Sequence, residues 1–183
     1  MGIKHLCKTR TETIPIPTSS FVDDTGMLIG TATAPKNPAY DTATTGQFSC
    51  DTQTNTGTTT NIFWTIVRLP TNYLPASNLS LSVDDLYTIG GDSVVVAATI
   101  DLEAFLYDSA AADFSNTDIC ATTAQSIAAT VGTDSFTVTG TTLAAGDTIL
   151  LRFTSVIQIT SAGGAGTCVN GFNNWKYTAT VKI

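Results

Sequence analysis

The sequence predicts an all-β fold, a two-sheet antiparallel sandwich of the jelly-roll type preceded by an extended N-terminal arm. From about Ser77 to Ile183, short runs alternate apolar and polar residues, as expected of strands with one buried face. Breaks rich in Gly, Asp and Asn separate these runs. Threonine, whose branched Cβ suits a pleated surface, is the commonest residue. We place the arm and an irregular loop in residues 1–60 and the sandwich domain in residues 61–183.

The first 60 residues differ in composition from the rest. Ile14-Pro15-Ile16-Pro17 predicts an extended segment, because proline removes a backbone donor and disfavours helix before it. Residues 27–32 form a candidate strand. Residues 34–60 are dominated by Thr, Asn, Gly, Pro and Ala, which predicts a long irregular loop. Such a loop is either ordered by a neighbouring surface or a floppy arm.

The strand pattern becomes dense after Asn61. Alternation or apolar runs predict strands at 62–68, 79–83, 94–106, 136–139, 148–157 and 175–183. Within them, one face is formed by Val94, Val96, Ala98, Ile100, Leu102, Ala104 and Leu106, and another by Ile149, Leu151, Phe153, Ser155 and Ile157. Residues 163–174 are expected to be a loop, and only 118–130 hint at helix. With the N-terminal strands the count approaches eight, which suits a jelly roll.

The charge balance excludes some partners. The net charge of −7 argues against a nucleic-acid binder, and no segment has the apolar length of a membrane span. No apolar segment follows the basic N-terminus as it would in a signal peptide. That terminus carries Lys4, His5, Lys8 and Arg10 on an otherwise acidic chain. These four residues are candidates for docking onto an acidic partner, and a merely solubilising terminus is the alternative.

The cysteines give no metal-binding pattern. Cys7, Cys50, Cys120 and Cys168 are scattered without a CxxC pair, and there is one histidine, so we expect no metal site. Four cysteines allow three complete pairings, and a bridge between Cys120 and Cys168 is conceivable. We expect free thiols, because no export signal is apparent.

The sequence offers few groups for catalysis. His5 is the sole candidate base and lies in the expected arm. Asp101 and Glu103 share one strand face and could act as a glycosidase pair, although any solvent-facing strand generates such pairs. Asp23-Asp24 and Asp84-Asp85 could bind calcium, but each is more typical of a turn. We therefore expect no enzyme, no catalytic residue and no cofactor.

The aromatic residues leave a sugar-binding alternative open. Trp64 shares a face with Ile62 and Ile66, and Trp175 and Tyr177 share one with Val181, so we place both tryptophans in the core. The residues expected to be exposed near strand ends are Tyr73, Tyr87 and Tyr107.

The order of segments in residues 60–183 resembles virion structural proteins of tailed phages. The resemblance is carried by residues 69–75 (LPTNYLP), 101–107 (DLEAFLY), 118–125 (DICATTAQ) and 143–152 (LAAGDTILLR). It implies a jelly-roll virion component and transfers no functional residues. We expect a capsid decoration or cement protein that forms a homotrimer and binds the major capsid protein. The alternative is a carbohydrate- or receptor-binding domain of a tail fibre or spike.

Overall fold

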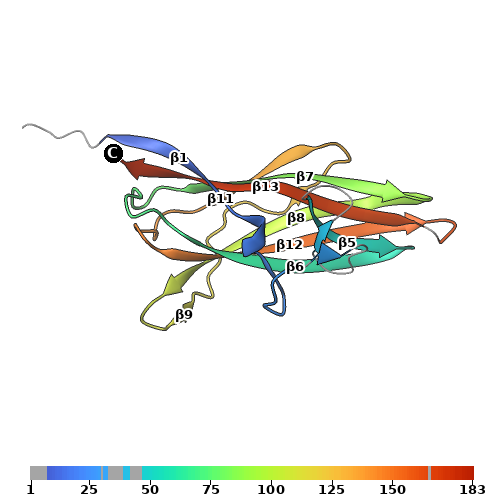
Figure 1. Cartoon of the computed structure of the whole chain (residues 1–183), viewed down its shortest axis with the longest axis horizontal. Helices are drawn as coiled ribbons and strands as arrows, with labels where there is room; N and C mark the ends of the chain where they lie inside the picture. Colours follow the sequence, from blue (N-terminus) through green and yellow to red (C-terminus); the bar gives the residue numbers. More distant parts are fainter. Residues whose placement is uncertain (1–7, 30, 33–38, 42–46, 165) are drawn as a thin grey trace, which may run out of the picture.

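The computed structural model describes residues 8–29, 31–32, 39–41, 47–164 and 166–183, and these form an elongated β-sandwich (Figure 1). One sheet runs in the order β11 (Gly132–Val138), β7 (Leu79–Gly90), β13 (Thr167–Lys182), β5 (Gln47–Thr54), β4 (Ala39–Asp41), β3 (Thr31–Ala32), and β1 (Thr9–Pro15) also pairs with β13. We call it the seven-stranded sheet.

The six-stranded sheet packs against it. Its order is β10 (Gln125–Ser126), β8 (Ser93–Asp108), β12 (Thr148–Ser161), β6 (Gly57–Arg68), β2 (Val22–Asp23), and β9 (Asp113–Phe114) also pairs with β8. Neighbouring strands are antiparallel except for the short parallel pair β3–β4. The predicted all-β, jelly-roll-like sandwich is therefore confirmed. No helix in the described part of the chain could span a membrane.

An aromatic cluster joins the two sheets. Phe63 and Phe153 stack with their ring centroids 5.3 Å apart, and Trp175 of the opposite sheet meets Phe153 edge-on at 4.8 Å. Phe21 and Phe172 complete the cluster, and all five side chains are buried. Such offset and edge-on contacts add to the free energy gained from burying the rings.

The predicted alternation is confirmed in the C-terminal strands. Each residue of the predicted inner face of β12 is buried: Ile149, Leu151, Phe153, Ser155 and Ile157. Phe136 and Val138 of β11 are also buried, as are Trp175 and Tyr177 of β13. The Ile14–Pro17 segment is extended, with β1 pairing along β13 from Thr9↔Lys182 to Pro15↔Lys176.

Three expectations about irregular segments were wrong. Residues 47–54 and 57–60 belong to β5 and β6, because threonine-rich sequence supports a strand as readily as a loop. Residues 167–174 belong to β13, which pairs with β7 and contains a bulge between Asn173 and Lys176. Residues 118–130 contain the short strand β10 and no helix.

A second bulge reverses the predicted face of β8 at its beginning. The register with β12 shifts between Gln158 and Ile159, so Val95 replaces Val94 and Val96 on the inner side. Val94 is 63% exposed as a result, whereas Ala98 through Ala104 keep the predicted alternation.

The N-terminal segment is part of both sheets. β1 lies beside the C-terminal strand, and β2 extends the six-stranded sheet next to β6 (Figure 1). Asp23 does mark a turn, as predicted, because its carboxylate accepts hydrogen bonds from the amides of Thr25 and Met27. A hydrogen bond from the Thr25 hydroxyl, together with these amide bonds, lowers the pKa of Asp23. Asp84 and Asp85, by contrast, lie within β7 rather than in a turn.

Candidate binding groove on the six-stranded sheet

The outer face of the six-stranded sheet carries an apolar and aromatic surface. Strand register places Phe105, Leu150 and Ile66 in one row across β8, β12 and β6. Glu103, Arg152 and Trp64 form the next row. Ile66 is 47% exposed, so this face is open to solvent rather than covered by another layer.

The loop that follows β8 forms a wall beside this surface. Between the wall and the sheet lies an open hollow of about 440 Å³. We call it the binding groove, and its lining residues are Glu103, Phe105, Asp113, Phe114, Ser115, Asn116, Asp118, Leu150 and Arg152. Apolar rings, carboxylates, an amide and a guanidinium therefore face one concave surface, a combination typical of small-molecule sites.

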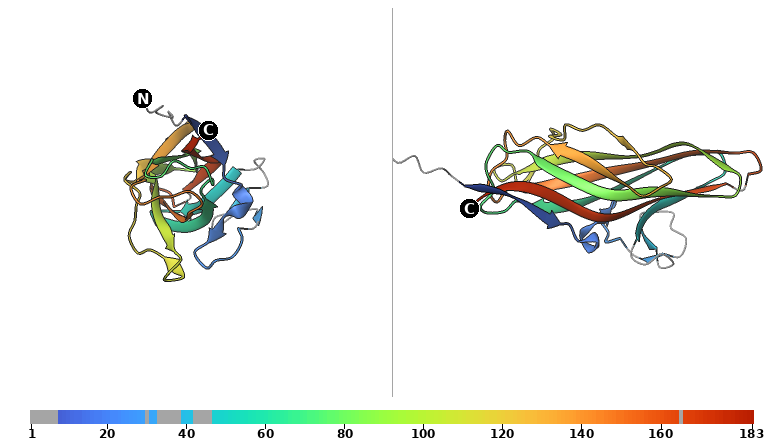
Figure 2. Two further views of the ribbon diagram at one scale, coloured as in Figure 1. Left: turned by 90° about the vertical axis from the view of Figure 1, so that its left-hand side faces the viewer. Right: turned by 90° about the horizontal axis from the view of Figure 1, so that it is seen from above.

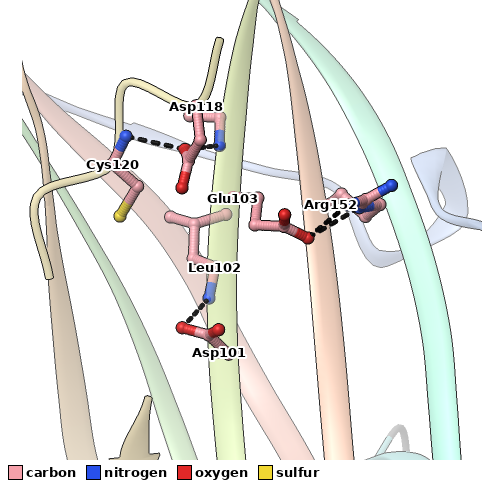
Figure 3. Close-up of polar contacts among 7 residues, drawn as sticks. Asp101, Leu102, Glu103, Asp118, Cys120 and Arg152 are labelled. Carbon is pink, nitrogen blue, oxygen red and sulfur yellow. Dashed lines mark hydrogen bonds and ion pairs between the residues drawn. The ribbon is translucent and has the colours of Figure 1, made fainter. Parts of the chain in front are cut away.

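Asp118 fixes the wall to the sheet. Its Oδ1 accepts hydrogen bonds from the amides of Ala104 in β8 and Cys120, both 2.8 Å long (Figure 3). The amide of Ile119 also donates to the carbonyl of Ala104, at 2.9 Å. The amide of Ser115 donates to the carbonyl of Leu106, at 2.8 Å. These bonds hold a short loop in a defined position, as a preformed site requires.

Arg152 occupies the floor of the binding groove. It lies directly opposite Glu103 in the β8–β12 register. Its Nε donates a hydrogen bond to Oε2 of Glu103 at 2.8 Å, and its Nη2 forms an ion pair with the same oxygen at 2.6 Å (Figure 3). Its guanidinium carbon lies 5.2 Å from the centre of the Phe105 ring. A carboxylate and an aromatic ring therefore hold the guanidinium of this groove-lining residue in place.

The wall also carries an aromatic pair. Phe114 of β9 meets Tyr107 of β8 edge-on, with ring centroids 5.3 Å apart. Tyr107 is 39% exposed and lines a second hollow of about 460 Å³ on the other side of the wall. Ser115 lines both hollows, so the wall is thin and presents side chains to each side.

A second projection stands at the opposite edge of the same sheet. Residues 22–28 fold into a hairpin beside β6, and a methyl group at Gly26 would lie 3.9 Å from Cζ2 of Trp64. This hairpin and the β9 segment extend beyond the body of the sandwich in the same direction (Figures 1 and 2). The open sheet face between them continues the surface of the binding groove toward Trp64.

The prediction that Trp64 lies in the core was therefore wrong. Ile62, Trp64 and Ile66 form the outer face of β6, whereas Phe63, Thr65 and Val67 form its buried face. Both faces carry apolar residues, so the apolar run did not show which face the core would cover. Trp175 lies in the core, as expected.

The tyrosines expected to be exposed differ from one another. Tyr107 is exposed, Tyr87 is half-buried, and Tyr73 is fully buried. The Tyr73 hydroxyl donates to the carbonyl of Ser77, and burial raises its pKa.

The two carboxylates considered as a catalytic pair have different surroundings. Glu103 is paired with Arg152. Asp101 accepts the amide of Leu102 at 3.0 Å, and its pKa is raised by burial and by the charges of Glu103 and Asp118. The described residues contain no group of three or more metal-ligating side chains placed to hold an ion.

Of the residues predicted to dock onto a capsid, the two described ones, Lys8 and Arg10, do not line the groove. Lys8 is exposed and Arg10 forms an ion pair with Glu12 on β1, part of the other sheet. Lys4 and His5 lie outside the described residues. Docking through these four residues stays a prediction.

Sequence reasoning did not find Phe105, Phe114, Asn116, Asp118 and Arg152 as site residues. Phe105 and Arg152 could have been placed on one outer face from the alternation of their strands. The residues of the wall lie in the loop after β8, and the periodicity of the sequence does not predict the path of a loop.

Comparison with known proteins gives an architectural likeness only. No family model matches the chain, and no curated protein matches it. Among solved structures, a protein described as CBM4 is 15% identical, with 74% of this chain and 72% of that chain covered and a TM-score of 0.40. TmCBM61, determined in complex with β-1,4-galactotriose, is 6% identical, with 91% and 86% covered and a TM-score of 0.41.

A tailspike domain of bacteriophage CBA120, tailspike protein 4, is also similar. It is 9% identical, with 96% of this chain but 19% of that chain covered and a TM-score of 0.39. At these identities and scores the likeness concerns the β-sandwich alone.

Proposed function

We propose that this chain is a carbohydrate-binding domain without catalytic activity, and that its ligand occupies the binding groove. This was the alternative hypothesis from the sequence, and the residues of the groove support it. The single observation that carries it is the placement of Phe105, Phe114, Asn116 and Arg152 around one open hollow on a rigid sheet.

The chemistry of a sugar ring matches this lining. A pyranose presents an apolar C–H face and a rim of hydroxyl groups, so its site needs aromatic surface beside planar hydrogen-bonding groups. Phe105 and Phe114 supply aromatic surface, while Asn116, Asp113 and Arg152 supply amide, carboxylate and guanidinium groups. The open shape of the groove suits a segment of a longer chain rather than an enclosed metabolite.

The polar groups in the groove are ordered before a ligand arrives. Asp118 is held by two backbone amides, and Arg152 by Glu103 and Phe105. Ordering side chains on binding costs about 0.5–1.5 kcal/mol for each flexible side chain, so a preformed groove loses less affinity in this way.

Binding without catalysis fits the state of the carboxylates. Arg152 holds Glu103, one member of the carboxylate pair, through a hydrogen bond and an ion pair to a single oxygen, so Glu103 serves to position the guanidinium.

A panel of immobilised neutral polysaccharides tests the proposal: cellulose, xylan, galactan, mannan and chitin. We expect the purified chain to bind at least one of them and Asn116→Ala to weaken that binding about tenfold, since a lost hydrogen bond in a binding site costs about 1–2 kcal/mol. Ile89→Ala is the matched control, because Ile89 is 55% exposed on β7 of the other sheet. Absence of binding to every polysaccharide, or an equal loss in both variants, contradicts the proposal.

Capsid decoration as a trimer stays a prediction, and no contact in the described part of the chain favours it over sugar binding. Incubation of the purified chain with undecorated capsids, followed by sedimentation, tests it directly.

A further inference from the structure

Acidic residues predominate in the part of the chain that forms the binding groove. Between residues 69 and 151 the sequence holds ten acidic residues and no lysine, arginine or histidine. Three of these acids, Glu103, Asp113 and Asp118, line the groove. Arg152 is its one basic lining residue, and Glu103 already neutralises it.

The carboxylates of the groove retain acceptor capacity. Asp118 uses Oδ1 for the amides of Ala104 and Cys120, and Asp113 uses Oδ1 for the amide of Phe114 at 2.7 Å. Within the described ranges, neither Oδ2 accepts a hydrogen bond. Asp101 lies close enough that its pKa is raised by the charges of Glu103 and Asp118, in addition to its burial. The groove is thus a concave surface with a net negative charge.

We propose that the groove selects glycans that carry free amino groups and rejects glycans that carry carboxylate, sulfate or phosphate groups. This inference rests on the proposed function and adds the ligand's chemical class to it. A protonated amine donates three hydrogen bonds and is attracted by Asp113 and Asp118, whereas an anionic substituent would be repelled by both. Like charges placed together at an interface repel, so charge distinguishes glycans that offer the same hydroxyl contacts.

Pairs of oligosaccharides that share a backbone and differ in charge test the inference. Glucosamine hexamers from chitosan are compared with their N-acetylated forms from chitin, and polygalacturonate oligomers with their methyl esters. At 0.15 M salt, where the Debye length is about 8 Å, only nearby charges contribute strongly. We expect the glucosamine hexamer to bind about threefold to tenfold more tightly than its acetylated form, and the polygalacturonate oligomer to bind more weakly than its ester.

Variants separate the groove from the overall acidity of the chain. Asp113→Asn keeps an oxygen for the Phe114 amide and removes one charge, so it should reduce the preference for the amine about threefold. Glu103→Gln leaves Arg152 unneutralised and should reduce the rejection of polygalacturonate. Glu12→Gln is the matched control, because Glu12 also pairs with an arginine, Arg10, but on β1 of the other sheet.

The outcomes distinguish the two proposals. Failure of every oligosaccharide to bind, charged or neutral, overturns the proposed function and this inference with it. Binding of a neutral oligosaccharide without any preference for the amine overturns the inference alone. A preference that falls equally in Asp113→Asn and Glu12→Gln also overturns it, because the attraction would then belong to the net charge of −7.

Discussion

Arg152 and Glu103 face each other across β12 and β8, and the pair sets the floor of the binding groove. Oε2 of Glu103 accepts a hydrogen bond from Nε of the guanidinium and forms an ion pair with its Nη2, and the guanidinium also lies over the Phe105 ring. The pair is partly exposed, with side-chain exposures of 43% and 31%, so its contribution to stability is small. The pair instead fixes the position of the Arg152 guanidinium among the carboxylates that line the groove.

Arg152→Lys tests that positional role. Lysine keeps the charge but loses the planar fork and the stacking on Phe105. We expect less than about 1 kcal/mol of change in the free energy of unfolding and a loss of sugar affinity of about fivefold or more. Urea denaturation and isothermal titration measure the two quantities. Arg68→Lys is the control, because Arg68 lies near the end of β6 and its Nε donates to the carbonyl of Gly146. Unchanged affinity in Arg152→Lys would show that the fork does not contact the ligand.

The two tryptophans provide a test of which face of each strand is buried. Trp175 is buried in the aromatic cluster, whereas Trp64 lies half-exposed on the outer face of β6. We expect Trp175→Ala to reduce the free energy of unfolding by about 3–5 kcal/mol and Trp64→Ala by about 1 kcal/mol. Denaturant titration of both variants measures the difference. Equal losses would contradict the assigned orientation of β6.

Asp85 and Asp134 predict a dependence of stability on pH. Asp85 is 2% exposed on the inner face of β7, and burial together with Asp134 raises its pKa to about 7. The unfolded chain releases this proton near pH 4, but the folded chain keeps it until about pH 7. The contribution of Asp85 to stability is therefore complete below pH 4 and is lost as the pH rises to 7.

Asp85→Asn should remove this loss. The amide stays neutral and can donate to Asp134, so we expect the variant to gain about 1–2 kcal/mol relative to the wild type between pH 5 and pH 8, after allowance for solvent screening. Thermal unfolding at several pH values measures it. Asp84→Asn should act in the opposite direction, because hydrogen bonds from Thr133 and Asn174 lower the pKa of Asp84. Parallel pH profiles for the wild type and Asp85→Asn would contradict the raised pKa of Asp85.

Gly140 permits a close approach of two chain segments. Its amide donates to Oδ1 of Asn78 at 2.9 Å, and an added Cβ would overlap the backbone carbonyl of Ser77. Because backbone cannot move aside as a flexible side chain can, Gly140→Ala should destabilise the fold by more than about 2 kcal/mol. Gly132→Ala is the control, since the nearest atom to its added Cβ would be 3.7 Å away. Similar melting temperatures for the two variants would contradict this packing.

The thiols should react slowly in the folded chain. Cys168 is buried and Cys120 half-buried, and burial raises the pKa of each to about 11. Both are free thiols, as expected from the sequence, and the conceivable bridge between them is not formed. Since the thiolate is the reactive form, we expect alkylation by iodoacetamide at pH 8 to be slow until denaturant is added. Mass spectrometry of the peptides containing each cysteine measures it, and rapid labelling in native buffer would contradict the burial.

The sequence allowed prediction of the sandwich because its strongest strands have one polar face. β12 is the clearest example, since every second residue from Ile149 to Ile157 is buried. Prediction was wrong where that contrast was missing. β5 is mostly polar, and the beginning of β13 contains Gly171 and several asparagines, so pairing with neighbouring strands supplies the order that local pattern does not show.

The binding groove could not be predicted from the local sequence pattern, for a different reason. It arises where a wall from residues 113–118 meets the outer faces of β8 and β12, and hydrogen bonds of Asp118 determine that meeting. Asp118 was visible only as one residue of an apparent helix. β6 also carries apolar residues on both of its faces, so its pattern did not show that Trp64 lies half-exposed on the outer face.

Mapping the ligand onto the structure by NMR tests the central claim most directly. The ¹⁵N-labelled chain is titrated with the panel oligosaccharide that it binds, and amide shifts are followed by residue. We expect shifts at Phe105, Phe114, Asn116 and Arg152, with the amides of Thr11 and Thr13 on β1 unchanged. Shifts confined to the seven-stranded sheet would contradict a sugar site in the groove.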